Sequence, residues 1–156
     1  MTLVSALSVD GILYCWGDNY YGQLGDGTST NKPVPQKVIV NNGKKIKQVT
    51  RSGYHVCAIS DDDTVWCWGY NFNGQIGDGT TTKKLVPTKI DIGDERVVTQ
   101  IVVGACHTCV RLDDNAMKCW GRNGHGQLGN GQLGTGNNNI VIKASRAQII
   151  TFPSTG

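Results

Sequence analysis

Residues 15–27 read CWGDNYYGQLGDG, and two later stretches repeat this pattern. Residues 67–79 read CWGYNFNGQIGDG, and residues 119–131 read CWGRNGHGQLGNG. Eight of the thirteen columns are identical in all three copies, and each copy starts 52 residues after the one before it. A fixed period of this length is typical of stacked repeat architectures. The sequence therefore predicts one repeat domain over residues 1–156.

The period divides the chain into three repeats, at residues 1–52, 53–104 and 105–156. The copies weaken toward both ends. Two repeats carry a histidine, His55 or His107, where the first carries Leu3, and the end of the third repeat lacks the Val-Pro pair of the other two. Atypical terminal repeats are expected of capping units, and a piece of a longer array would look the same.

The apolar segments inside each repeat are short, rich in β-branched and aromatic residues, and bounded by Gly, Asp, Asn or Pro, as in VCAIS at 56–60. This is the pattern of β-strands, and no segment has helical spacing of apolar residues. Folding residues 56–68 about Asp62 predicts a hairpin in which Cys57 faces Cys67. The fold class is therefore all-β, a partial β-propeller of about three four-stranded blades with one 52-residue repeat per blade.

The six cysteines leave three interpretations open. Cross-hairpin disulfides would join Cys57 to Cys67 and Cys109 to Cys119, since opposed residues in a hairpin lie close together. The sequence favours a second interpretation, reduced cysteines that pack as small core residues. The third interpretation is a metal or redox site at the CxxC of Cys106 and Cys109, but the second repeat lacks this pattern. No metal and no cofactor are expected.

Composition excludes several classes of protein. Charged residues make up 17% of the 156 residues and the net charge is +3, which does not indicate a polyanion-binding tail. The basic residues Lys44, Lys45, Lys47 and Arg51 are interpreted as a solvated loop, so direct nucleic-acid binding is not expected. No apolar run is long enough to span a membrane. The start of the chain has no signal-peptide pattern, which favours the cytoplasm or nucleus, or an extracellular location if the chain is a piece.

Catalysis is not indicated. The chain contains no nucleophile elbow, phosphate-binding loop or zinc-protease motif. His55 and His107 recur at one position of the repeat, which favours a structural hydrogen bond over a catalytic role. The sequence predicts no catalytic residue and no enzyme activity.

Variable columns inside the constant frame are the best candidates for binding. Repeat proteins commonly keep a frame and vary loops on one face to bind partners. Tyrosine and arginine are also enriched among the residues that dominate interfaces. The alternative is that these aromatic side chains only cover the edge of each blade. The candidate residues between Cys-Trp-Gly and Gly-Gln are Asp18, Tyr20, Tyr21, Tyr70, Phe72, Asn73, Arg122 and His125.

The residues Cys15-Trp16-Gly17, Asn19 and Gly22-Gln23-Leu24-Gly25, with their copies, resemble the repeat of the regulator of chromosome condensation family. The resemblance covers nearly the whole chain. It implies the fold of a seven-bladed propeller of four-stranded blades, which is also similar to that of β-lactamase-inhibitor protein II. The founding member is a guanine-nucleotide exchange factor for the GTPase Ran that binds chromatin, and other members are interaction modules, ubiquitin-ligase parts or inhibitors.

Three repeats would span less than half of such a ring. An open arc exposes strand edges that invite pairing with another chain. We therefore expect a non-enzymatic protein–protein interaction module that is a fragment or self-associates through its open blade edges. The first alternative, by family resemblance, is an exchange factor or regulator of a small GTPase. The second is a secreted inhibitor or surface-binding module.

Overall fold

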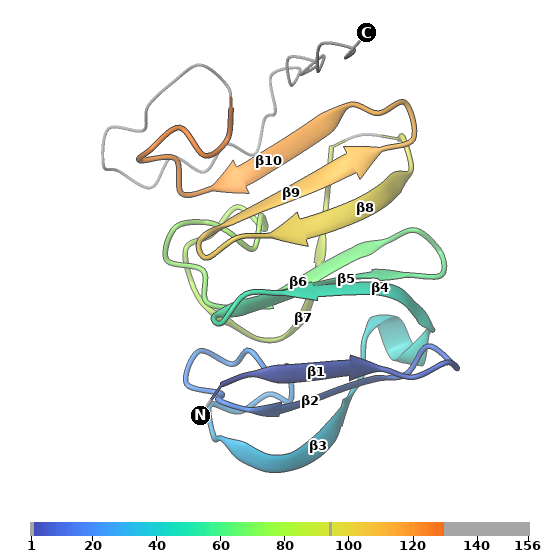
Figure 1. The fold of residues 1–156 in the computed structure, drawn as a ribbon, viewed down its shortest axis with the longest axis vertical. Coiled ribbons are helices and arrows are strands. Elements are labelled where there is room, and N and C mark those ends of the chain that lie inside the picture. The colour runs from blue at the N-terminus through green and yellow to red at the C-terminus, as the bar shows by residue number, and fades with distance from the viewer. Residues whose placement is uncertain (1, 94, 130–156) are drawn as a thin grey trace, which may run out of the picture.

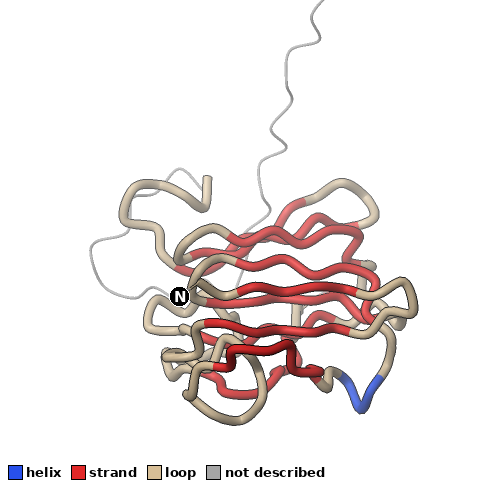
Figure 2. The backbone as a smooth tube through the Cα atoms, turned by 60° about the horizontal axis from the view of Figure 1, so that its bottom comes forward, coloured by secondary structure: helices blue, strands red, loops and turns tan. Residues whose placement is uncertain are grey.

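Three antiparallel β-sheets form the molecule and lie one above the other (Figure 1). The computed structural model describes residues 2–93 and 95–129. The sheets are referred to below as the first, second and third blade, and the second lies between the other two. Figure 2 shows that the loops gather at the ends of the strands. The all-β partial propeller predicted from the sequence is thereby confirmed, and its arc is open.

The strands follow the chain order within each blade. The first blade consists of β1 (Val4–Leu7), β2 (Leu13–Gly17) and β3 (Lys32–Val38). The second consists of β4 (Ile46–Arg51), β5 (His55–Ser60), β6 (Val65–Gly69) and β7 (Lys84–Ile90). The third consists of β8 (Val98–Val103), β9 (His107–Leu112) and β10 (Met117–Gly121). A short 3-10 turn, η1 (Asn41–Gly43), precedes β4.

The hairpin register agrees with the register predicted from the sequence. Cys57 lies opposite Cys67 on β5 and β6, and Cys109 lies opposite Cys119 on β9 and β10. The turn at Asp63 has a φ of 66°, which closes the hairpin with few residues. The side-chain positions along each hairpin are therefore the same in the second and third blades.

The blades are offset from the repeat boundaries of the sequence. Strand β4 ends at Arg51 and pairs with β5, so the second blade takes its first strand from the residues before 53. The third blade likewise begins with β8, before residue 105. Only the second blade shows four strands within the described part of the chain. The degenerate end of the third repeat lies outside the described residues.

The core consists of two hydrophobic clusters, one between each pair of neighbouring blades. Trp68 is completely buried in the cluster between the first and second blades. Trp120 is buried in the cluster between the second and third blades. Burial of an aromatic side chain of this size is among the largest contributions that one residue makes to a core. Burial of these clusters between the sheets therefore stabilises the stacking of the blades. No helix in the described residues has the length and apolar character needed to cross a membrane.

Candidate binding surface

A buried asparagine organises the loop that follows β2. The side-chain nitrogen of Asn19 donates to the Asp26 carboxylate at 3.2 Å and to the backbone oxygens of Thr28 and Thr30 at 3.1 and 3.0 Å. Its side-chain oxygen accepts a hydrogen bond from the Leu24 amide at 3.0 Å. One buried side chain thus ties together both halves of the loop, because it replaces backbone hydrogen bonds that the loop cannot make by itself.

A buried asparagine makes equivalent hydrogen bonds in the other two blades. Asn71 donates to Asp78 at 3.1 Å and to Thr82 at 3.0 Å, and accepts from the Ile76 amide at 2.9 Å. In the third blade Asn123 accepts from the Leu128 amide at 3.0 Å. The constant columns of the repeat therefore form a rigid loop. The residues of the variable columns project from this loop, and their side chains differ from one repeat to the next.

Five aromatic rings from these loops and a neighbouring turn form a continuous surface, referred to here as the aromatic cluster. The ring centroids of Tyr20 and Tyr21 lie 4.9 Å apart, those of Tyr21 and Tyr70 lie 4.7 Å apart, and those of Tyr70 and Phe72 lie 4.9 Å apart. Tyr54 lies 5.9 Å from Tyr21 and 6.0 Å from Tyr70. These spacings lie in the range of favourable aromatic contacts, three of them edge-to-face and two tilted.

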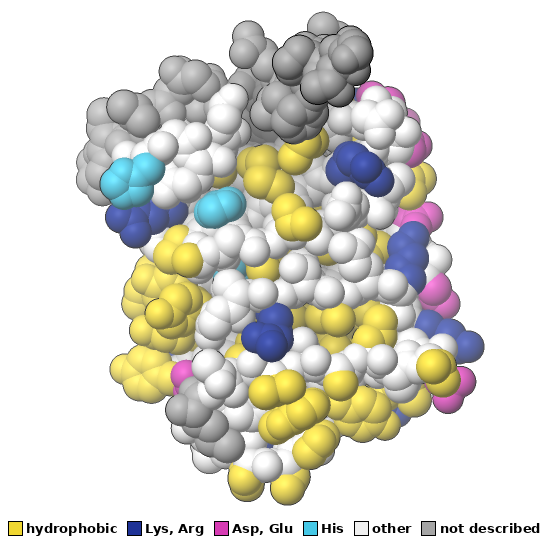
Figure 3. All heavy atoms as spheres, in the orientation of Figure 1, with side chains coloured by type: hydrophobic (Ala, Val, Ile, Leu, Met, Phe, Trp, Pro, Cys, Tyr) yellow, Lys and Arg dark blue, Asp and Glu magenta, His cyan; other side chains and the backbone are white. Residues whose placement is uncertain are grey.

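Much of the aromatic cluster faces solvent. Tyr20, Phe72 and Tyr54 are 68%, 52% and 47% exposed. Figure 3 shows hydrophobic side chains gathered at the left edge of the molecule, over the loops that follow β2 and β6. Contiguous exposed apolar patches with a polar rim are one type of surface at which proteins bind partners.

Cationic side chains border the aromatic cluster. The Lys83 ammonium lies 5.8 Å from the centre of the Tyr20 ring, within the range of a cation–π contact. Arg122, which is exposed, interacts electrostatically with Tyr70 from the third blade. Partial burial, with a smaller effect of the Cys106 thiol, raises the pKa of the Tyr70 hydroxyl. The surface therefore combines phenol rings with two cationic side chains, one acting on Tyr20 and one on Tyr70.

The structure brings together four of the eight residues predicted from the variable columns, namely Tyr20, Tyr21, Tyr70 and Phe72. Of the others, Asn73 forms a side-chain hydrogen bond with Tyr70, and the charge of Arg122 lowers the Tyr70 pKa against the larger effect of burial.

Asp18 and His125 have different roles. The Asp18 carboxylate accepts a hydrogen bond from the Tyr20 amide at 3.3 Å and so shapes the loop. His125 is exposed and makes no ring contact with the aromatic cluster in the described part of the chain.

Sequence reasoning missed Tyr54 and Lys83. Tyr54 lies in the turn between β4 and β5, outside the variable columns, and stacking of the blades brings it to the aromatic cluster. A signal was present, because Tyr54 occupies a column that holds Cys106 in the next repeat and is therefore variable itself. Lys83 follows the loop of the second blade and reaches back to the first, where it contacts the Tyr20 carbonyl at 3.4 Å.

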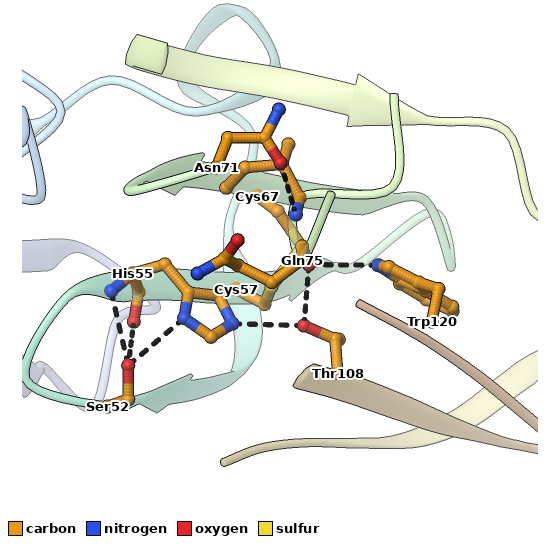
Figure 4. The surroundings of a disulfide bond; sticks show 9 residues. Ser52, His55, Cys57, Cys67, Asn71, Gln75, Thr108 and Trp120 are labelled. Carbon is orange, nitrogen blue, oxygen red and sulfur yellow. Dashed lines mark hydrogen bonds between the residues drawn. A yellow bond between two sulfur atoms is a disulfide. The ribbon is translucent and has the colours of Figure 1, made fainter. Parts of the chain in front are cut away.

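The buried histidine of the second blade serves structure. His55 is fully buried, and its two ring nitrogens lie 3.0 Å from the hydroxyls of Ser52 and Thr108 (Figure 4). The Thr108 hydroxyl donates to the Gln75 carbonyl at 2.7 Å, so its oxygen accepts from the Nε2–H of His55. The structural hydrogen bond predicted for His55 is confirmed, and it links the second blade to the third.

The dependence of the free energy of unfolding on pH tests the role of His55 between the second and third blades. Burial, with a smaller effect of His107, lowers the pKa of His55 from 6.5 to about 3. A histidine with a lowered folded-state pKa stabilises the fold above pH 6.5, and this contribution is lost as the pH falls toward 3. We expect the free energy of unfolding to fall by up to about 1.4 kcal/mol per pH unit in denaturant titrations below pH 6.5. His55→Gln should remove this slope, and an unchanged slope in the variant would contradict the assignment.

Disulfides join Cys57 to Cys67 and Cys109 to Cys119 in the structure. This differs from the reduced state that the sequence favoured, because opposition across each hairpin brings the two sulfurs together. Cys15 and Cys106 are free thiols. Burial raises the pKa of the Cys15 thiol to about 12, which makes it unreactive. Cys15 lies opposite Ser5, so the first blade has no such pair.

The redox state in solution is a prediction that thiol counting tests. We expect the denatured, unreduced protein to contain two titratable thiols and the reduced protein to contain six. In the native protein Cys106 should react first, since Cys15 is buried. Six thiols before reduction would instead show that the cysteines are reduced core residues.

The basic residues predicted to form a solvated loop lie partly in β4, which contains Lys47 and Arg51, and two of the four are paired with carboxylates. Lys44 forms an ion pair with Asp62 at 2.7 Å, and Lys47 pairs with Asp63. The Lys44 ammonium holds the pKa of Asp62 well below its usual value. No group of three or more metal-ligating side chains is found within the described ranges.

Comparison with known proteins agrees with this architecture. The model of the Regulator of chromosome condensation (RCC1) repeat matches residues 10–59 and 62–111. A second model of the same repeat matches residues 46–75 and 98–127, which start at the first strands of the second and third blades.

Relatives and solved structures extend the comparison. The ultraviolet-B receptor UVR8 of Arabidopsis thaliana is 32% identical over 123 residues, which are 79% of this chain and 28% of that protein. The human E3 ubiquitin-protein ligase HERC2 is 28% identical over 97% of this chain and 3% of that protein. This chain therefore spans less than a third of these relatives.

Human WBSCR16 superimposes with a TM-score of 0.74 at 27% identity, over 85% of this chain and 35% of the other. Prp20p of Saccharomyces cerevisiae superimposes with a TM-score of 0.76 at 18% identity, over 94% of this chain and 36% of the other, which shows the shared fold alone. With repeat matches over more than half of its residues, this chain belongs to the family of Regulator of chromosome condensation (RCC1) repeat proteins.

Proposed function

We propose that this chain is a non-enzymatic protein-interaction module and that its partner docks on the aromatic cluster. The observation that carries the proposal is the continuous contact of five rings, three of them exposed, of which four lie on loops that a buried asparagine holds rigid. The comparisons support a protein partner in general, since HERC2 is a ubiquitin-protein ligase and Prp20p is described as binding Gsp1p and histones.

The chemistry of the surface defines the partner. Tyrosine rings supply large contact area at low cost in conformational entropy, and they combine apolar faces with hydroxyl groups. Lys83 and Arg122 flank the rings, so the partner should present apolar side chains with acidic residues beside them. Ring contacts already present in the free protein reduce the ordering cost of binding.

A triple substitution tests the proposal. Tyr20→Ala, Tyr70→Ala and Arg122→Ala together should leave the fold intact, because Asn19, Asn71 and Asn123 hold the three loops that carry these residues and none of the three side chains belongs to the core. We expect them to weaken partner binding by about 30-fold or more, the scale of a lost hot spot. The partner is identified by photo-crosslinking from position 20, and its affinity is measured by calorimetry.

The matched control changes exposed apolar residues outside the aromatic cluster. Val34→Ala with Met117→Ala removes side chains that are 57% and 41% exposed without touching a ring. This control should bind as the unchanged protein does. Equal affinity of the triple variant and the control would show that the partner uses another face.

The exchange-factor alternative rests on family resemblance, and a nucleotide-release assay across a panel of small GTPases separates it from the proposal. We expect no acceleration of release by this chain. Stimulated release with any member of the panel would favour the alternative. The secreted-inhibitor alternative shares the oxidised cysteines expected above, so the thiol count does not separate it from the proposal.

A further inference from the structure

Neighbouring blades are joined by the same contact twice. The indole Nε1–H of Trp68 donates to the Gln23 carbonyl of the first blade at 3.0 Å, and that of Trp120 donates to the Gln75 carbonyl of the second blade at 2.9 Å. Each tryptophan therefore packs against the Gly-Gln-Leu/Ile-Gly loop of the preceding blade. We refer to the tryptophan as the plug and to the Gly-Gln-Leu/Ile-Gly loop that receives it as the socket.

A glycine makes room for each plug. A Cβ built on Gly25 would lie 2.8 Å from the Trp68 Nε1, and one built on Gly77 would lie 2.5 Å from the Trp120 Nε1. Real Cβ contacts are essentially never shorter than 3.0 Å. The socket is therefore shaped for an indole ring, and the glycine that follows Gln-Leu or Gln-Ile is the residue that opens it.

The chain carries one plug and one socket that these two contacts do not use. Trp16 of the first blade is half-buried, and its indole donates no hydrogen bond within the described residues. At the other end, a Cβ built on Gly129 meets nothing within 4 Å in the described part of the chain, in contrast to Gly25 and Gly77. Among the described residues, no side chain fills the socket of the third blade, whereas Trp68 and Trp120 fill its two copies.

Two further features of the outer blades are available for contact with another chain. The Gln48 side chain on β4 donates to the Ile101 carbonyl on β8 at 2.9 Å, whereas Gln100, at the same position one repeat later, is exposed. Val102 beside it is 47% exposed. At the opposite end β1 is an edge strand, paired with β2 only, and such an edge favours pairing with another chain.

We propose that the third blade of one chain receives Trp16 from a second copy of the chain, so that two copies stack head to tail. The two faces are at opposite ends of the molecule with the second blade between them, so they do not meet within one chain (Figure 1). They are complementary because the same plug and socket fit each other twice inside the molecule. Different faces of two identical chains make a heterologous contact, which adds further copies unless it closes into a ring.

This contact is independent of the aromatic cluster, and its test separates the two. Sedimentation velocity of the unchanged protein over a range of concentrations should show mass increasing beyond one chain. Trp16→Ala removes the plug, and Gly129→Leu fills the socket. Each variant alone should remain monomeric, with association weakened by about 30-fold or more.

Mixing the two variants gives the decisive result. The Gly129→Leu chain retains its plug and the Trp16→Ala chain retains its socket, so an equimolar mixture should form a dimer that grows no further. A mixture that stays monomeric, variants that associate as the unchanged protein does, or an unchanged protein that is monomeric at all concentrations would overturn the proposal. Should Trp16→Ala fail to fold, Trp16→Phe keeps the ring and should still weaken association, because it lacks the N–H donor. Tyr20→Ala with Tyr70→Ala should associate normally.

Discussion

Trp68→Ala is expected to lower the free energy of unfolding by about 4 kcal/mol or more. Truncation of a buried tryptophan to alanine costs about 3–5 kcal/mol, and an unpaired buried carbonyl at Gln23 adds to this. A domain of this size has a total stability of about 5–15 kcal/mol. The substitution should therefore bring the protein close to unfolding at room temperature, measured as the midpoint of urea denaturation followed by circular dichroism.

Trp16→Ala is the matched control for this effect. Trp16 occupies the same column of the first repeat, but it is half-buried and makes no hydrogen bond through its indole in the described residues. In dilute, monomeric protein its truncation should cost less than half as much as that of Trp68. Equal costs at the two positions would contradict the assignment of Trp68 as the side chain that joins two blades.

Gly77→Ala is expected to cost about 2–4 kcal/mol although it adds only one methyl group. Gly77 has a φ of 85°, where an alanine is strained by about 1 kcal/mol. The new Cβ would also lie 2.5 Å from the Trp120 Nε1 and 2.8 Å from its Cε2. The indole would therefore have to move away from the loop that contains Gly77. Overpacking of this kind costs a further 1–3 kcal/mol or so. Denaturant titration with tryptophan fluorescence would report both the stability and the movement of the indole.

Gly93→Ala isolates the contribution of the backbone. Gly93 also has a positive φ, 63°, but a Cβ there meets nothing within 4 Å. Its substitution should cost about 1 kcal/mol, the strain alone. If Gly93→Ala and Gly77→Ala were equally destabilising, the close approach of Trp120 would not be the reason for glycine at position 77.

Local pattern was sufficient to predict the hairpins and their register. Folding the chain about Asp62 placed Cys57 opposite Cys67, because side-chain alternation and a three-residue turn leave few alternatives. The constant glycines and Trp68 were correctly attributed to architecture. The physical reason is that the same residues must fill the same contact in every blade, so repetition within one chain reveals them.

The position of the blade boundary could not be predicted from the period. A repeat has a length but no natural starting point, and only the pairing of β4 with β5 shows that a blade begins near Ile46. The contribution of Tyr54 was missed for a related reason. Its contacts with Tyr21 and Tyr70 depend on the stacking of one sheet on the next, which no local pattern encodes.

The sequence also left undetermined whether the cysteines are oxidised or reduced. Spacing showed that Cys109 and Cys119 face each other, and it could not show whether their sulfurs are bonded. The chemistry of the compartment decides this in the cell.

Hydrogen exchange of the four tryptophan indole N–H groups, followed by NMR in dilute solution, tests the account most directly. The groups are assigned with single Trp→Phe variants. The stacked-blade architecture predicts slow exchange for Trp68 and Trp120, whose indoles donate to buried carbonyls of the preceding blade, and fast exchange for Trp16. Rapid exchange at Trp68 and Trp120, at the rate of Trp16, would contradict it.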